Sequence, residues 1–277
     1  MTVVEYEDAP TLWRDAEAFL SRNPANNTHQ LSAIKRILDL GARGGERFFA
    51  VLDDHGSLTG SAVVVDTQTL FLSVMHIDVV ASLAAHLRDV EVNLAGVIGR
   101  QDVLDAFVPT FAQPATVLVN LMLYQLEGSP DFGRATGEAR LATMNDLPLL
   151  VEWHAAFEHE VGMIKVPTPL LERVTRRIND RQLTLWIDDE TVVSFAGANA
   201  LPAASARVGP VYTPPELRGR GYAQAVTAAA SVHVQCDQPR TIFLNTDAVN
   251  PASNKAYQRI GYRHIADHAH LLFEPAY

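Results

Sequence analysis

Two segments of the chain, one in each half, show the same pattern in the same order. Residues 48–65 (FFAVLDDHGSLTGSAVVV) and 183–200 (LTLWIDDETVVSFAGANA) each contain a strand pattern, a turn beginning Asp-Asp, and a second strand pattern. Each segment follows a pair of stretches whose apolar residues recur at helical spacing. These stretches are 11–20, 28–40, 148–157 and 170–178. Asp-Asp turns are common between strands, but helices and hairpins together predict a duplicated unit of the α/β class.

A linker is expected near the middle of the chain. The apolar run 117–126 (VLVNLMLYQL) is long enough for a buried strand, and a turn-forming run of Gly, Ser, Pro and Asp follows at 128–131. The length of 277 residues suits two domains of ordinary size better than one large core. We therefore predict an N-terminal domain at residues 1–128 and a C-terminal domain at 137–277.

Composition and charge exclude several classes of protein. With 48% hydrophobic and 19% charged residues, the chain can form packed interiors, and dominant disorder is excluded. A net charge of -10 disfavours nucleic acid as a partner, because phosphate contacts require clustered Lys and Arg. A lone cysteine, Cys236, can form neither an internal disulfide nor a Cys-rich zinc site. It points to a reducing, cytoplasmic setting.

No membrane segment is expected. Residues 1–10 are acidic and lack the basic region that opens a signal peptide. The most apolar long stretch, 69–87, is interrupted by His76, Asp78 and His86, which argues against a membrane span. The sequence does not indicate an oligomeric state.

A glycine loop in the second half combines a strand end with a helix start. The strand pattern 208–213 runs into two prolines, and the loop Arg-Gly-Arg-Gly-Tyr-Ala at 218–223 opens an Ala-rich helix at 224–234. Free N–H groups at such a helix start, and the helix dipole, favour a bound phosphate. The loop is neither a Walker A loop nor a dinucleotide-binding G-x-G-x-x-G motif. The alternative is a plain glycine turn into a helix.

A second block follows at residues 241–262. A buried-type strand at 242–244 is expected to end in a polar loop that contains Asn245, Asp247 and Asn250. A helix at 252–260 then ends at a glycine. Loops beyond the carboxyl ends of strands are where α/β sheets place their ligands.

Together the two blocks resemble the GNAT acyltransferase superfamily. The phosphate loop of that family is Arg/Gln-x-x-Gly-x-Gly/Ala, which Arg218, Gly221 and Ala223 match. Its second pattern is Asn-x-x-Ala/Ser-x-x-x-Tyr-x-x-x-Gly-aromatic. The residues that match it are Asn250, Ser253, Tyr257, Gly261 and Tyr262. The first half has no such loop and resembles a degenerate GNAT-like domain, so the fold expected is two GNAT-like domains in tandem, each with a mixed sheet.

The resemblance implies acetyl-CoA, or another acyl-CoA, as cosubstrate and no metal. It places Val211 and Thr213 along the pantetheine arm by their backbones, and Asn250 and Ser253 along the pantetheine and adenosine path. The pyrophosphate would be bound by backbone N–H groups of the loop residues Arg218, Gly219, Arg220, Gly221, Tyr222 and Ala223. Tyr257 would protonate the departing thiolate without a strongly perturbed pKa, after direct attack by an amine. The alternative for Tyr257 is a helix residue that packs on the sheet.

The general base is not provided where many members of the family carry it. The strand before the loop, 204–210, contains no carboxylate. The base must lie elsewhere or act through water, and the nearest candidates are Glu158, His159 and Glu160 at the end of the first helix of this domain. The alternative for these residues is a solvated helix end.

The acceptor cannot be identified from the sequence. A small-molecule amine, a protein N-terminus and a lysine all remain open. The function expected from the resemblance is that of an N-acetyltransferase, which Tyr257 supports. A function of another class is also open: the missing carboxylate slightly supports an acyl-CoA-binding regulatory or scaffold protein without catalysis. Three histidines near the C-terminus, His264, His268 and His270, could suggest a metal, but we interpret them as surface residues.

Overall fold

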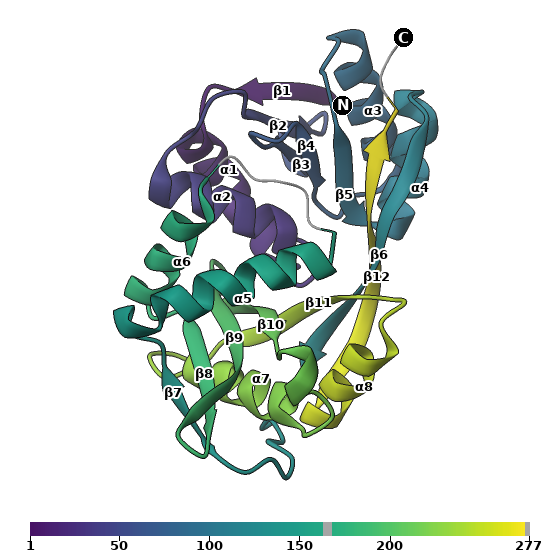
Figure 1. Ribbon diagram of the computed structural model, residues 1–277. Helices are drawn as coiled ribbons and strands as arrows, with labels where there is room; N and C mark the ends of the chain where they lie inside the picture. Colours follow the sequence, from purple (N-terminus) through teal and green to yellow (C-terminus); the bar gives the residue numbers. More distant parts are fainter. Residues whose placement is uncertain (163–167, 275–277) are drawn as a thin grey trace.

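The two segments with Asp-Asp turns fold as hairpins in equivalent places of a repeated architecture (Figure 1). The computed structural model describes residues 1–162 and 168–274. Each half runs in the same order: strand, two helices, three strands, helix, strand, helix, strand. The order confirms the duplication that the sequence predicts, and the mixed α/β class with it.

The elements of the first half, in chain order, are β1 (Thr2–Tyr6), α1 (Ala9–Ser21), α2 (Thr28–Leu40), β2 (Arg47–Leu52), β3 (Leu58–Val64), β4 (Thr69–Leu72), α3 (Ile77–Asp89), β5 (Gly96–Arg100), α4 (Gln101–Phe111) and β6 (Ala115–Leu126). Those of the second half are β7 (Glu138–Leu141), α5 (Leu147–Glu160), α6 (Leu170–Asn179), β8 (Leu183–Asp188), β9 (Thr191–Leu201), β10 (Ser205–Tyr212), α7 (Tyr222–His233), β11 (Thr241–Asp247), α8 (Pro251–Ile260) and β12 (Tyr262–Phe273). Short 3₁₀ turns, η1 (Met144–Asp146) and η2 (Pro215–Leu217), precede α5 and the glycine loop.

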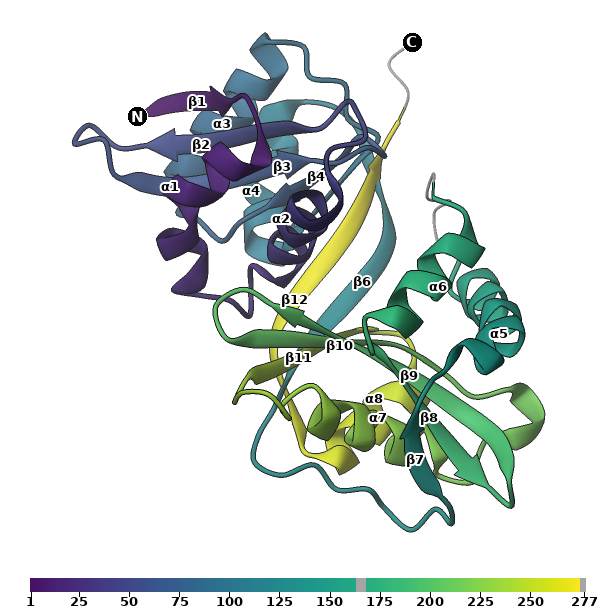
Figure 2. The same ribbon diagram turned by 90° about the vertical axis from the view of Figure 1, so that its left-hand side faces the viewer.

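The last strand of each half is exchanged into the sheet of the other half. The strand order is β1-β2-β3-β4-β5-β12-β6-β11-β10-β9-β8-β7. β12 therefore pairs with β5, β6 pairs with β11, and the two long strands pair with each other antiparallel along their length. Figures 1 and 2 show both strands running from one lobe of the molecule to the other. The predicted domain boundaries at residues 128 and 137 stay a prediction, and one sheet contains strands from both sides of them. Residues 275–277 of the predicted second domain lie outside the described part.

Each half buries its sheet between two pairs of helices. α1 and α2 pack on one face of the first half through a cluster that includes Leu12 and Ile34, while α3 and α4 cover the other through Leu83 and Phe107. In the second half, α5 and α6 cover one face, and α7 and α8 cover the opposite face. The glycine loop opens α7, so its helix belongs to the second of these layers.

Two expectations differ from the structure. The run 117–126 is a strand, but its first part is not buried: the exposed fractions of Val117 and Leu118 are 57% and 40%. The reason is that β11 pairs only with Leu121–Gln125 of β6, which leaves the start of β6 as an edge. β11 also continues through Asp247, so Asn245 and Asp247 lie in a strand and not in a loop, because β6 pairs with them.

Helices α3 and α4 were not predicted. The apolar stretch 69–87 contains β4 and most of α3. No helix in the described part of the chain is both long enough and apolar enough to cross a membrane.

Gly96 of β5 lies against the backbone of the exchanged strand β12. A Cβ added there would lie 2.5 Å from the carbonyl oxygen of Leu271, whereas one added at Gly99 on the same strand would meet its nearest neighbour, Leu72 Cβ, at 3.4 Å. We predict that Gly96→Ala lowers the free energy of unfolding by about 1–3 kcal/mol, because backbone must shift to admit the methyl group. Gly99→Ala, the matched control, should change it much less. Equal effects in chemical denaturation would show that the β5–β12 contact is not tightly packed.

Candidate active site in the second half

The sheet of the second half opens between β10 and β11. The two strands are parallel and pair only from Ser205–Thr241 to Arg207–Phe243. β10 continues to Tyr212 beside β9, with an irregularity between Val208 and Val211, while β11 continues to Asp247 beside β6. Beyond Arg207 the two strands no longer pair, so the backbone N–H and C=O groups on their facing edges do not bond to each other. Val211, a predicted pantetheine contact, lies on this edge.

Thr213 follows directly after β10 and is fixed by its side chain. Its hydroxyl lies 2.8 Å from the hydroxyl of Ser194 on β9, and Ser194 donates a bond of 2.9 Å to the carbonyl of Tyr212. Both side chains are buried. The path of the backbone where β10 leaves the sheet is therefore set by hydrogen bonds within the second half.

The glycine loop adopts a backbone that favours glycine. Gly219 has φ +79°, and Gly221, the N-cap of α7, has φ +87°. The first helical bond runs from the N–H of Ala225 to the carbonyl of Gly221 at 3.1 Å, so the amides of Tyr222 and Ala223 have no acceptor within the helix. Gly219, Arg220 and Gly221 are exposed. The arrangement presents bare amides and a cationic side chain at one point.

The loop is held from two sides by side chains. On one side the guanidinium of Arg218 donates bonds of 2.8 and 2.7 Å to the carboxylate of Glu160 at the end of α5, and its Nε donates to the carbonyl of Thr213 at 2.9 Å. On the other side the phenol of Tyr222 donates to the carboxylate of Asp188, the last residue of β8. This bond raises the pKa of Tyr222 and lowers the pKa of Asp188.

Helix α8 places the residues of the second block. The side chain of Asn250 caps the helix by accepting a bond of 3.1 Å from the N–H of Ser253. Two turns further on, Tyr257 is half-buried and its ring meets that of Tyr262 edge to face, with ring centroids 6.2 Å apart. Burial raises the pKa of Tyr257 to about 12. The expectation of an unperturbed pKa is therefore wrong, because the helix packs this phenol against the core.

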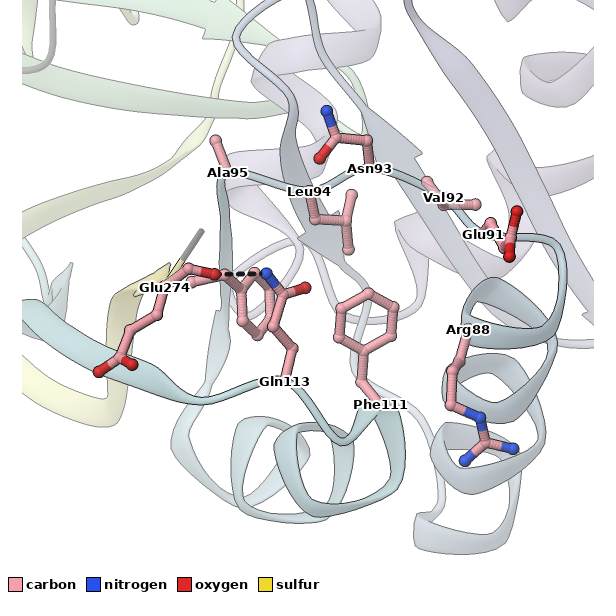
Figure 3. Close-up of a pocket in the computed structure, with 10 residues that line it drawn as sticks. Arg88, Glu91, Val92, Asn93, Leu94, Ala95, Phe111, Gln113 and Glu274 are labelled. Atoms are coloured by element: carbon pink, nitrogen blue, oxygen red, sulfur yellow. Dashed lines mark hydrogen bonds between the residues drawn. The ribbon is translucent and has the colours of Figure 1, made fainter. Parts of the chain in front are cut away.

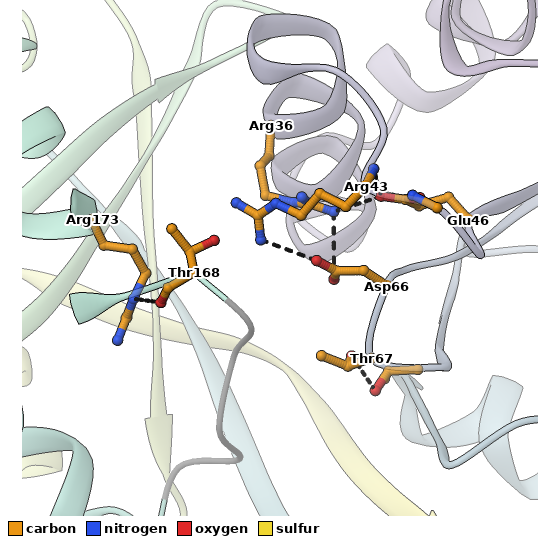
Figure 4. A network of polar contacts seen from close by, with 9 residues as sticks. Arg36, Arg43, Glu46, Asp66, Thr67, Thr168 and Arg173 are labelled. Carbon is orange, nitrogen blue, oxygen red and sulfur yellow. Dashed lines mark hydrogen bonds and ion pairs between the residues drawn. The ribbon is translucent and has the colours of Figure 1, made fainter. Parts of the chain in front are cut away.

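The two candidate base residues at the end of α5 are both engaged by arginine. Glu158 accepts bonds of 2.6 and 3.0 Å from Arg173 of α6, and Glu160 accepts from Arg218 as described above. Arg173 also donates to the carbonyl of Thr168 at 3.3 Å (Figure 4). Glu158 is half-buried, while His159 and Glu160 are exposed.

Figure 4 also draws a network of the first half, in which Arg43 contacts Asp66 at 3.0 Å and Arg36 lies 3.6 Å from Glu46 and 3.7 Å from Asp66. These ion pairs join the end of α2 to the start of β2 and to the β3–β4 turn. They leave the carboxylates of Glu46 and Asp66 engaged within the first half.

The equivalent segment of the first half is built differently. Between β4 and α3 the chain reads Ser73, Val74, Met75 and His76, with no glycine. The N–H of Val74 donates to the side chain of Asn27 at 2.9 Å, and His76 caps α3 through the N–H of Asp78 at 3.4 Å. Amides that are free in the second half are thus occupied or capped by side chains in the first.

A cavity of about 470 Å³ lies in the first half, and none of the predicted site residues lines it (Figure 3). Its walls come from the ends of α3 and α4, from the segment before β5 and from the end of β12. The hydrogen bond drawn across it joins the Gln113 amide to the carbonyl of Glu274 at 2.7 Å.

The C-terminal histidines do not lie at the surface as expected. His268 is 1% exposed and His270 is half-buried, because β12 runs between β5 and β6 in the middle of the sheet. Only His264 fits the expectation in part, with its Nε2 2.8 Å from Asp267. Among the described residues, no group of three or more His, Cys, Asp or Glu side chains is placed to hold a metal ion.

Two residues that matter for the geometry were missed. Asp188 opens the Asp-Asp turn, which the sequence marks as a hairpin but not as an anchor for the glycine loop. Arg173 lies on the polar side of α6, and nothing in its spacing relates it to Glu158 fifteen positions away. Both depend on contacts between elements.

Comparisons with known proteins agree with this geometry. Residues 191–271 match the family model described as FR47-like protein. A comparison with curated proteins finds no match.

Among solved structures, similar ones include an acetyltransferase from the GNAT family of Colwellia psychrerythraea (TM-score 0.62, 16% identity, 100% of each chain covered). A GCN5-related N-acetyltransferase from Sphaerobacter thermophilus has a TM-score of 0.65 and 16% identity, over 99% of this chain and 97% of that one. A tandem GNAT protein from the clavulanic acid biosynthesis pathway has a TM-score of 0.57 and 11% identity, over 100% and 99% of the chains. These similarities confirm the expected GNAT fold in a two-domain arrangement.

Proposed function

We propose that the chain is an acyl-CoA-dependent N-acyltransferase, with acetyl-CoA as the acyl donor and the second half as the catalytic domain. The observation that carries the proposal is the opening of β10 from β11 next to a glycine loop whose amides are free. The names of the similar structures, several of them GNAT acetyltransferases, and the FR47-like match in the same half support it. We place the activity in the cytoplasm, where acetyl-CoA and a reduced Cys236 are compatible.

The residues present fit a CoA thioester. Pyrophosphate needs backbone N–H donors that no Cβ obstructs, and Gly219 and Gly221 provide this with Tyr222 and Ala223 at the start of α7. Arg220 adds an exposed positive charge. The pantetheine arm carries amide groups, which can pair with the backbone of Val211 on the open edge of β10 and of Thr213 just beyond it, whose carbonyl also accepts from Arg218. On this proposal Asn250 acts mainly through its cap, which fixes the start of α8 and the position of Ser253.

The transfer needs a nucleophile, a leaving group and two proton movements. The amine attacks the thioester carbonyl, its new C–N bond forms, and the C–S bond breaks. Tyr257 gives its proton to the sulfur and recovers one from solvent. With a pKa of about 12, this phenol remains protonated throughout the neutral range, so its proton is in place, but the raised pKa also makes it a weaker acid than a free tyrosine.

The group that takes the proton from the amine does not follow from one contact. Glu158 and Glu160 remain candidate bases, but each is bound by a guanidinium, which stabilises the charged carboxylate and weakens it as a base. We propose that water carries the proton away from the amine and that Glu160 mainly anchors the loop through Arg218. The acceptor is a small-molecule amine, a protein N-terminus or a lysine.

A second candidate function rests on the same observation. If neither glutamate is available, and β10 carries no carboxylate, an acyl-CoA-binding regulatory or scaffold protein is the alternative. Measuring release of free CoA thiol over a panel of amines separates the two functions. Thiol release that depends on an amine supports the enzyme, whereas acetyl-CoA binding without release supports the alternative.

Gly221→Val tests the cofactor site. The substitution places a branched side chain at φ +87° beside the free amides, so the expected result is loss of the rise in Tm that acetyl-CoA gives the wild type. At ligand concentrations about 100-fold above Kd that rise corresponds to about 2.7 kcal/mol. Gly56→Val is the matched control, because Gly56 has φ +79° in the β2–β3 turn of the first half. It should carry a similar strain and keep the rise. If acetyl-CoA does not stabilise the wild type at millimolar concentration, the assignment is wrong.

Tyr257→Phe tests the proton donor. The ring and its packing on Tyr262 remain, while the proton is lost, so we expect kcat to fall on the order of 10²-fold with little change in the Kd of acetyl-CoA. The matched control is Tyr262→Phe, which removes a buried phenol 2.7 Å from the hydroxyl of Ser231. That variant should lose stability and keep most of its kcat. Normal turnover by the Tyr257 variant would make Tyr257 a packing residue.

A further inference from the structure

Three arginines of the second half, Arg176, Arg177 and Arg207, lie half-buried without a carboxylate partner among the described residues, and the last two lie near the opening of the sheet. Arg207 on β10 and Arg177 on α6 form no ion pair among the described residues, in contrast to Arg173 and Arg218, and the stretches 163–167 and 275–277 contain no Asp or Glu. Arg177 donates instead to the carbonyl of Gly209 at 2.8 Å and to Asn199 at 3.2 Å.

The surroundings of Arg207 are polar and come from both halves of the chain. Arg207 is the last residue of β10 that pairs with β11, so it lies where the two strands begin to part. On β11, Asn245 follows its partner Phe243 by two positions and therefore points to the same face of the sheet. From the first half, His29 of α2 reaches the same region. Its ring lies 5.6 Å from that of His268 on β12, measured between centroids. We call Arg207, Asn245, His29, His268 and His270 the junction cluster.

The junction cluster has unused hydrogen-bonding capacity. Among the described residues, neither amide atom of Asn245 forms a hydrogen bond of ordinary geometry, and the same holds for Nε2 of His29, Nδ1 of His268 and Nε2 of His270. Burial lowers the pKa of His29 well below its usual range, the positive charge of Arg207 lowers it further, and the side chain of Asn245 raises it in part. Burial also lowers the pKa of His268 and His270 to about 4, so the imidazoles are neutral at pH 7 and Arg207 carries the charge. Leaving buried polar atoms unpaired costs stability that a bound polar ligand would recover.

The position of the cluster relates it to the acceptor. α7 and α8 cover one face of this sheet, and Ala206 and Leu244 point into that layer. Arg207 and Asn245 alternate with these residues and so face the other side, toward the first half. Because Arg207 is the last residue of β10 that pairs with β11, it lies beside the opening in which we place the transfer.

We infer that the acceptor amine carries a carboxylate, which Arg207 binds with the help of Asn245 and His29. A guanidinium and a carboxylate form paired, charge-assisted hydrogen bonds, and a partly buried site strengthens them. The first half then contributes to acceptor recognition through α2. The inference rests on the proposed function and adds the substrate class to it.

The test compares matched acceptors and matched variants. Acetyl transfer from acetyl-CoA is measured for the common amino acids, for their primary amides, which lack the negative charge, and for phosphoethanolamine. The wild type should prefer at least one free acid over its amide by about 10-fold or more in kcat/KM. Arg207→Met should remove most of that preference by raising KM for the acid, with the Kd of acetyl-CoA unchanged. Arg207→Lys should restore part of it, because it restores the charge. The matched control is Arg263→Met, which removes an exposed arginine of β12 and should keep the preference.

The outcomes separate this inference from the proposed function. Equal use of acids and amides by the wild type, a preference for phosphoethanolamine over every acid, or an unchanged preference in Arg207→Met would overturn the carboxylate site while the transferase stands. If no amine is acetylated, the proposed function fails, and the carboxylate site is then tested by ligand binding alone. Tm is then measured with N-acetyl amino acids as free acids and as amides. A rise with a free acid that is lost in Arg207→Met supports the site, and no rise with any acid contradicts it.

Discussion

The antiparallel pairing of β6 with β12 is the interaction on which the rest of the structure depends. Each strand begins beside the sheet of one half and ends beside the sheet of the other, so neither half completes its sheet with its own last strand. β6 provides the partner that holds β11 as far as Asp247, well beyond the point at which β10 leaves it. The opening between β10 and β11 is therefore stabilised by a strand from the first half. The first half therefore has a structural role in the sheet of the second half, whether or not it binds a cosubstrate.

The two halves keep one architecture and differ in one loop. In the second half, positive φ angles at Gly219 and Gly221 leave amides free at the start of α7, and side chains from α5 and from the end of β8 hold the loop in place. In the first half, side chains of Asn27 and His76 take up the corresponding capacity. On the proposed function, a binding half and a structural half differ in backbone conformation and capping at this turn, with the order of strands and helices retained.

Much of this architecture could be predicted from local patterns. Helical spacing predicted α1, α2, α5 and α6, and the Asp-Asp turns predicted both hairpins, since these features depend on neighbours in the sequence. The exchange of β6 and β12 could not be predicted, because a strand pattern does not state its partner. That exchange also explains why Val117 is exposed and His268 is buried, contrary to the expectations for both. The glycine loop and α8 were predicted by motif, but the arginines that engage Glu158 and Glu160 come from distant elements, and so does the burial that raises the pKa of Tyr257.

The central claim is that one acyl-CoA site exists and that it lies in the second half. Hydrogen–deuterium exchange with and without acetyl-CoA tests it most directly, because it reports the location of binding on the intact chain. The account predicts slower exchange at residues 208–213 and 218–224, and no change at 73–78, the equivalent turn of the first half. Protection at 73–78, or protection that spares the glycine loop, would contradict it.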